Sequence, residues 1–424
     1  MNCKFYTRFL AVIILVLVVG SCGTTHNIRK ELHQSHRKTS FFKGFVLYNP
    51  ISKKEIINHN GAKYFTPASN TKLVTFYTAY RTFKDSVQGL AYYKTGDSLV
   101  IKGLADPSLF YGFQTQQIID FLRGQQDSIY LADSTIDETP YGSGWAWDDY
   151  QYYYMPEKSL FPIYGNIVSY AFKGDSVISI PEYFRKSITI LDSVVVSREL
   201  AENKFYLQRN HQSKKGVPFV TSNQLTAKLL GDTIHKYIKV IPNSKYFDYK
   251  VINSLPFDSL YQKMLTVSDN FIAEQLMLMV GKKVSNLYSV DEAIKFSLAN
   301  YLSDFPQKPR WVDGSGLSRY NLFTPNDMVF LLEKMYREIP RQQLFSYFPI
   351  GGKTGTLKNW YANDRPFVYA KSGSLSNNYN LSGYIITKKG TLLIFSYMNN
   401  HFRVPTAVVK KEIEKTLKKI YNTY

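Results

Sequence analysis

A serine and a lysine three positions apart give the first indication of chemistry in this sequence. Ser69 lies just after Pro67, where a helix can begin, and Lys72 follows three positions later. Side chains at positions i and i+3 lie on one face of a helix, so the lysine amine can reach the serine hydroxyl. A serine hydroxyl becomes a nucleophile when a neighbouring base takes its proton. The pair therefore suits an activated serine.

The segment after Ser69 has the pattern of a helix with one buried face, because apolar residues recur at helical spacing: Leu73, Phe76, Tyr77 and Tyr80. Ser-x-x-Lys alone is a weak signal, since Ser35 and Ser40 also have a lysine three positions later. Those two serines lie in or beside a polar stretch with no apolar helix behind them. Ser69 is therefore the preferred nucleophile.

Two further motifs accompany Ser69. Ser268-Asp269-Asn270 precedes an apolar helical pattern, and alone it would be read as a helix N-cap. Lys371-Ser372-Gly373 comes at the end of the predicted strand 367–370 and is followed by Ser374. Ser-x-x-Lys, Ser-Asp-Asn and Lys-(Thr/Ser)-Gly in this order are the signature of penicillin-recognising serine enzymes.

A second candidate for the third motif is Lys353-Thr354-Gly355. It follows Pro349 and the glycine pair 351–352, which argue against a strand. The chemistry needs a strand edge that pairs with an extended peptide. Lys371 is therefore preferred to Lys353.

The chain resembles the class C penicillin-binding proteins of the D-alanyl-D-alanine carboxypeptidase/endopeptidase type. The similarity covers nearly all of residues 41–398 and rests on six segments: 67–73, 103–109, 144–149, 268–276, 313–319 and 371–375. Two departures are evident. Ser372 stands where threonine is usual, and the interval from Ser69 to Ser268 is short for two inserted domains, so one insert is expected to be reduced.

Chemistry and this resemblance together suggest a role for each motif residue. Ser69 would form an acyl-enzyme, with Lys72 as its base if burial and the neighbouring cation Lys371 lower the lysine pKa. Ser268, like the middle serine of the family, would relay the proton to the leaving amine. Asn270 would hold Lys72 and bind a substrate amide.

The remaining positions are expected to bind the substrate. Lys371 and Ser372 would hold the terminal carboxylate, with Gly373 and Ser374 completing the binding strand. The backbone N–H groups of Ser69 and Ser374 would form the oxyanion hole.

The expected fold is α+β, of the β-lactamase/transpeptidase type. An antiparallel sheet flanked by helices would carry a β-rich insert between the first and second motifs. Residues 41–85 and 256–424 would form the catalytic domain, and residues 86–255 the inserted part. Within the insert, short alternating runs such as 99–102, 177–180 and 193–196 predict strands, and residues 116–122 predict a helix.

The N-terminus resembles a lipoprotein leader. A basic start and an apolar run end in Val19-Gly20-Ser21-Cys22, so residues 1–21 would be a signal peptide and residues 22–40 a tether. An ordinary cleaved signal is the alternative. A lipid on Cys22 would anchor an exported protein at a membrane, facing the periplasm. The other cysteine is Cys3, so no disulfide is expected.

The chain is strongly basic, with a formal charge of +19. Its lysines are scattered and no nucleic-acid motif is evident, so an anionic membrane or cell wall is the expected partner, rather than nucleic acid. A generally basic surface is the alternative. No metal or cofactor is expected, because the histidines are dispersed and the closest pair, His33 and His36, lies in the tether.

The preferred function is that of a serine-type D-Ala-D-Ala carboxypeptidase, with or without endopeptidase activity, that acts on peptidoglycan stem peptides and is acylated by β-lactams. Three alternatives stay open. A β-lactamase or esterase would use the same scaffold, a sensor of β-lactams or muropeptides would be acylated without turnover, and a basic adhesin would not be acylated.

Overall fold

A five-stranded antiparallel sheet joins the two ends of the chain. The computed structural model describes residues 26–31 and 41–424, apart from 115, 175, 210–214 and 245. The sheet has the order β13-β14-β15-β1-β2, so the early strands β1 and β2 lie beside the last three. Phe45 of β1 is opposite Tyr397 of β15. The strands are β1 (Phe42–Asn49), β2 (Lys54–His59), β13 (Val368–Leu375), β14 (Asn378–Ile386) and β15 (Leu392–Asn400).

Helices cover both faces of this sheet. Alternate residues of a strand point to opposite faces, so Phe45 and Leu47 pack in a core with α10 (Thr406–Thr423), whereas Val46 packs in the helical core. That second core is built from α2 (Thr71–Thr82), α5 (Phe257–Thr266), α6 (Asn270–Ser285), α7 (Val290–Asn300), α8 (Pro325–Glu338) and α9 (Arg341–Tyr347). The predicted antiparallel sheet flanked by helices is confirmed.

Helix α2 is buried more completely than its sequence pattern predicts. All residues from Thr71 to Ala79 are buried. The threonines tolerate this because their hydroxyls have partners: Thr75 donates to the carbonyl of Gly314 (2.6 Å), and the hydroxyl of Thr78 lies 2.7 Å from that of Ser297. Because α2 is packed on all sides, the position of the Ser69 turn that leads into it is well defined.

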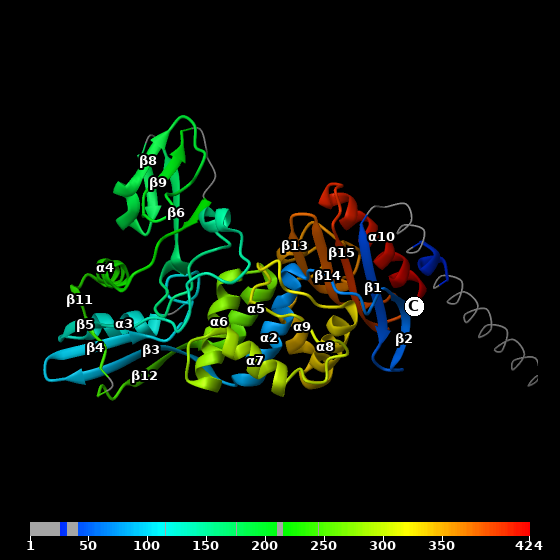
Figure 1. Cartoon of the computed structure of the whole chain (residues 1–424), viewed down its shortest axis with the longest axis horizontal. Helices are drawn as coiled ribbons and strands as arrows, with labels where there is room; N and C mark the ends of the chain where they lie inside the picture. The colour runs from blue at the N-terminus through cyan, green and yellow to red at the C-terminus, as the bar shows by residue number, and fades with distance from the viewer. Residues whose placement is uncertain (1–25, 32–40, 115, 175, 210–214, 245) are drawn as a thin grey trace, which may run out of the picture.

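The segment between the first two motifs forms a separate group of strands that extends away from the catalytic sheet (Figure 1). One hydrophobic core in it draws its buried residues from positions 90 to 238. Its largest sheet, β11-β5-β4-β3-β12, contains two parallel pairs, β4 with β5 and β5 with β11. These strands are β3 (Ser86–Thr95), β4 (Ser98–Gly103), β5 (Ser128–Asp133), β11 (Ile238–Pro242) and β12 (Lys250–Pro256).

Smaller elements complete this region. A three-stranded sheet has the order β10-β6-β7, and β8 pairs with β9. Their bounds, with those of the two helices, are β6 (Ile167–Lys173), β7 (Ser176–Ile180), β8 (Ile188–Leu191), β9 (Phe205–Gln208), β10 (Lys215–Pro218), α3 (Gln116–Gly124) and α4 (Asn223–Ile234).

Three local predictions differ from the structure. Residues 193–196 form no strand, because the run is largely solvent-exposed: Val195 is 93% exposed and has no apolar face to cover. Helix α4 was not expected in a β-rich stretch. Lys371 lies in the interior of β13 rather than after a strand, because β13 continues to Leu375 through its pairing with β14.

The short 3₁₀ helix η1 (Ala68–Asn70) packs directly against β13 and β14. The Asn70 side chain donates to the hydroxyl of Ser382 (2.8 Å), and Asn380 donates to the carbonyl of Thr66 (2.9 Å). A Cβ added at Gly373 would lie 2.4 Å from the Pro67 carbonyl oxygen. Glycine at this position allows the strand to approach the Ser69 turn closely.

Replacement of this glycine tests the close approach. Gly373→Ala should push β13 away from η1 and lower the free energy of unfolding by about 1–3 kcal/mol, as expected for overpacking. Hydrogen exchange of the 67–72 segment should become faster at the same time. Gly124→Ala is the matched control, because an added Cβ there meets no atom within 4 Å. Equal stability and exchange for both variants would contradict the packing described.

Candidate active site

Ser69 and Lys72 are in contact, as their spacing predicts. Ser69 lies in η1, and the Lys72 side chain comes from the first turn of α2. The Lys72 amine donates to the Ser69 hydroxyl oxygen at 3.0 Å, to Asn270 Oδ1 at 2.6 Å and to the carbonyl of Ser315 at 2.6 Å. Three acceptors thus hold the amine beside the hydroxyl.

The third motif meets the second in the same place. The Lys371 amine donates to the Ser268 hydroxyl at 2.8 Å and to the carbonyl of Ser372 at 2.6 Å. Ser268 lies in the middle of the short turn between α5 and α6 and has a φ of +63°, a conformation that non-glycine residues rarely adopt. Such backbone strain is concentrated at functional sites.

Burial lowers the pKa of both lysines. The pKa of Lys72 falls to about 8, chiefly through loss of hydration, although the carboxylates of Asp313, Glu274 and Asp269 act in the opposite direction. The pKa of Lys371 lies well below its ordinary value, first because of burial and second because of the charge on Lys72. Burial lowers the pKa of Lys72, as expected. The repulsion between the two lysines was expected to lower the pKa of Lys72 as well, but it lowers the pKa of Lys371 instead.

An open cleft of about 780 Å³ lies over these groups, and it is lined by residues of all three motifs: Ser69, Ser268, Asn270, Ser372 and Ser374. Lys72 and Lys371 are fully buried beneath it. The competing Lys353 lies in a turn outside the lining, but its neighbour Thr356 accepts a hydrogen bond from Ser372 at 2.8 Å.

The Asp313 loop is a further part of the site that the motifs alone did not identify. It directs the Ser315 carbonyl at Lys72. Glu274 fixes this loop by accepting hydrogen bonds from the backbone of Gly314 (3.1 Å) and Ser315 (2.7 Å). Asp313 itself accepts hydrogen bonds from Gly316, Ser318, Asn321 and Trp145. The family resemblance included residues 313–319, but the role of the Ser315 carbonyl could not be predicted, because every residue type has a backbone carbonyl.

The inserted segment also reaches the site. Asn270 donates to the carbonyl of Tyr154 at 2.8 Å, and the Tyr111 hydroxyl donates to Asp269 at 2.9 Å. Asn270 therefore holds Lys72 through its oxygen, and its amide nitrogen already has a protein partner. This leaves the amide nitrogen less available for a substrate than expected.

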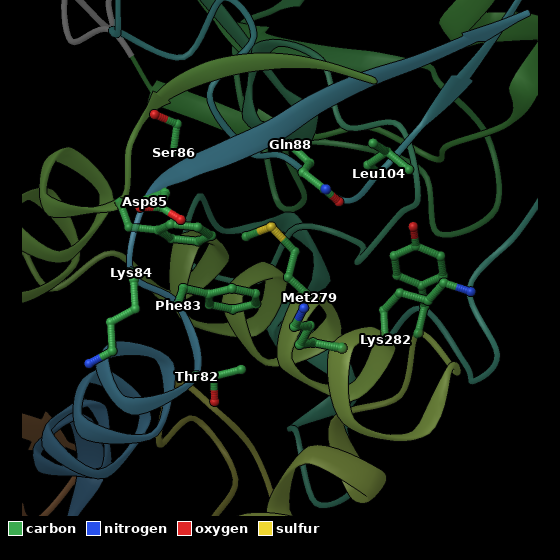
Figure 2. Close-up of a pocket in the computed structure, with 12 residues that line it drawn as sticks. Thr82, Phe83, Lys84, Asp85, Ser86, Gln88, Leu104, Met279 and Lys282 are labelled. Carbon is green, nitrogen blue, oxygen red and sulfur yellow. The ribbon is translucent and has the colours of Figure 1, made fainter. Parts of the chain in front are cut away.

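A second cavity, of about 530 Å³, lies where the chain enters and leaves the insert. Its lining includes Phe83, Met279, Lys84 and Lys282, and in Figure 2 the Met279 side chain points toward the other side chains while Lys84 extends away. None of the predicted site residues lines it. The cleft at Ser69 is therefore the candidate active site.

Cys22 lies outside the described residues, so the predicted lipid site stays a prediction. No helix in the described part of the chain is long and apolar enough to cross a membrane.

Comparisons with known proteins agree with the geometry. The model of the D-Ala-D-Ala carboxypeptidase 3 (S13) family matches residues 25–179 and 243–424. The D-alanyl-D-alanine carboxypeptidase DacB of Haemophilus influenzae is 25% identical over 415 residues, 85% of each chain. The penicillin-sensitive carboxypeptidase A of Dictyostelium discoideum is 25% identical over 414 residues, 80% of this chain and 78% of that protein.

Solved structures show the same fold. Penicillin-binding protein 4 of Haemophilus influenzae has a TM-score of 0.74 at 20% identity and covers 94% of this chain and 99% of its own. A peptidoglycan endopeptidase of Bdellovibrio bacteriovorus has a TM-score of 0.52 at 15% identity, with 90% and 93% covered. The predicted family is confirmed by the family model: the chain belongs to the D-Ala-D-Ala carboxypeptidase 3 (S13) family, a family of serine D-Ala-D-Ala carboxypeptidases.

Proposed function

We propose that Ser69 is the nucleophile of this carboxypeptidase and that Lys72 is its base. The observation that carries the proposal is the contact between the Lys72 amine and the Ser69 hydroxyl, in a buried site that lowers the pKa of the amine to about 8. A neutral amine can accept a proton, and a pKa near the working pH favours such a transfer.

The reaction would follow from these contacts. Ser69 attacks the carbonyl carbon of the penultimate D-alanine as its proton passes to Lys72, and the oxyanion is held by the N–H groups of Ser69 and Ser374. The C–N bond breaks when the Ser268 hydroxyl gives its proton to the leaving amine and receives in its place the proton that Lys72 took from Ser69. The Lys371 amine donates a hydrogen bond to the Ser268 oxygen throughout. Water then hydrolyses the Ser69 ester and regenerates the enzyme.

Substrate binding would use the part of the β13 edge that follows Ala370, because residues 368–370 already pair with residues 349–351. This strand ends the sheet, so the backbone beyond Ala370 can pair with an extended peptide by strand addition. The hydroxyls of Ser372 and Ser374 line the cleft and would bind the terminal carboxylate. Lys371 would act from beneath, through Ser268 and the Ser372 carbonyl, instead of holding the carboxylate directly as the motif suggests.

The substrates would be peptidoglycan stem peptides, and peptides in cross-links would be cleaved in the same way. β-Lactams would acylate Ser69 and leave slowly. This assignment is supported by the family and by the relatives, one of which is named as penicillin-sensitive.

The domain division proposed for the chain follows the three catalytic motifs. Residues 41–85 and 256–424 would form the catalytic domain, because Ser69-x-x-Lys72, Ser268-Asp269-Asn270 and Lys371-Ser372-Gly373 lie in them. Residues 86–255 would form an inserted unit that supports the site through Tyr111 and Tyr154. The family model leaves residues 180–242 of this unit unmatched.

Removal of the nucleophile tests the central assignment. Ser69→Ala should abolish covalent labelling by fluorescent penicillin and lower D-alanine release by about 10³-fold or more. Mass spectrometry of the unchanged protein should place the penicillin adduct on the peptide that contains Ser69. Ser40→Ala, which alters another Ser-x-x-Lys match, is the control and should label normally. Labelling of Ser69→Ala would show that another group is the nucleophile.

The pH dependence tests the base. Because a base must be neutral, kcat/KM for D-alanine release should rise with pH and level off above a pKa of about 8. Asp269→Asn should move this rise to lower pH, since the Asp269 carboxylate raises the pKa of Lys72. A rate that stays constant on both sides of pH 8, or a shift to higher pH in the variant, would exclude Lys72 as the base.

The membrane anchor can be tested separately. We expect Cys22→Ser to move the exported protein from the membrane fraction to the soluble fraction, because a lipid on Cys22 would be its anchor. Cys3→Ser is the control and should stay with the membrane. A protein that remains membrane-bound without Cys22 would need another means of attachment.

A further inference from the structure

Lys410 is a charged residue of the cleft that no motif includes. It lies on α10 and lines the same cleft as Ser69 and Ser374. Its amine is 5.0 Å from the ring centre of Tyr379 and 5.0 Å from that of Trp360. Two aromatic rings therefore hold this cation in a defined place.

No counter-ion for Lys410 is found in the part of the chain that the structure describes. Within the described residues its amine takes part in no ion pair or hydrogen bond, whereas Lys418 and Lys419 on the same helix are each paired with a glutamate. The side chain is half-buried, and loss of hydration lowers the pKa of Lys410. A partly buried cation without an anion is costly, and a ligand with a negative charge would offset that cost.

The position of Lys410 suits the end of the substrate that carries a charge. Tyr379 is directly opposite Ser374 in the β13–β14 ladder. Because the Lys410 amine lies over the Tyr379 ring, it is close to the part of β13 that is proposed to bind the substrate. Figure 1 shows α10 beside the strands of this sheet. Trp360, the second ring beside Lys410, follows the segment whose Thr356 accepts a hydrogen bond from Ser372.

The other positive groups near the strand are not equivalent. Lys371 is fully buried, and its amine is already hydrogen-bonded to Ser268 and to the Ser372 carbonyl. Arg319, the other cation of the cleft lining, belongs to the loop after Asp313 and is exposed, so water already hydrates its charge. Ser372 and Ser374 offer only neutral hydroxyls.

We infer that Lys410 is a specificity-determining residue that supplies the positive charge for the C-terminal carboxylate of the substrate. This role rests on the proposed function, because that function provides the substrate with the carboxylate. Lys410 attracts and orients the carboxylate, while the hydroxyls on β13 donate hydrogen bonds to it. It makes no bond to the reacting carbonyl and takes no part in proton transfer.

The test compares ligands with and without the carboxylate. Acylation rates of Lys410→Gln would be measured with benzylpenicillin and its methyl ester, and with an acyl-D-alanyl thioglycolate and its methyl ester. We expect the rate with the free acids to fall about tenfold or more, as for loss of a hydrogen bond to a charged group. The rates with the esters should stay within about twofold of the unchanged protein.

Two matched variants complete the experiment. Lys411→Gln removes the same charge from the next, exposed position of α10 and should behave like the unchanged protein with every ligand. Lys410→Arg keeps the charge and should recover most of the rate with the free acids. Melting temperatures would show whether each variant is folded.

The outcomes separate the two proposals. If Lys410→Gln slows acids and esters equally, or slows neither, the inference is wrong while Ser69 acylation still stands. If Lys410→Arg is folded but does not recover the acylation rate with the free acids, the positive charge is not the property that matters and the inference is also wrong. If the unchanged protein is not acylated on Ser69 at all, the proposed function fails first, and the role of Lys410 fails with it.

Discussion

Two buried amines that lie close together set the main constraint on this structure. Lys72 and Lys371 are both fully buried, and the charge on one lowers the pKa of the other. Two adjacent ammonium groups without water would repel each other strongly. The three carboxylates that raise the pKa of Lys72 limit this effect, and the close packing of η1 on β13 keeps the pair together. The sheet carries Lys371, the helices carry Lys72 and Glu274, and the loops carry Asp269 and Asp313, so all three kinds of element contribute charges to this site.

Much of the site was predictable because its side chains carry recognisable motifs. Ser69 and Lys72 meet through local helical geometry, and the strand predicted at residues 367–370 is the reason to prefer Lys371 to Lys353. Their meeting with Ser268 followed from the family resemblance rather than from spacing. The antiparallel sheet was predictable from the alternating apolar residues of its strands.

The rest depended on features without a sequence signature. The carbonyls of Ser315 and Tyr154 hold Lys72 and Asn270, but any residue type presents a carbonyl. The run 193–196 has strand propensity without a surface to cover, which is why it stays irregular. Helix α2 was expected to expose one face, and only the partners of its threonine hydroxyls explain its full burial.

The pairing of β1 with β15 has a consequence for how the protein matures. Phe45 and Tyr397 are neighbours in the sheet although almost the whole chain separates them. A growing polypeptide whose last strand, β15, has not yet been made would already contain all four reactive side chains, which are Ser69, Lys72, Ser268 and Lys371. It would have no strand to join β1 to β14, so it would carry every reactive group without an assembled cleft. The cleft can therefore assemble only after the last strand of the sheet has become available.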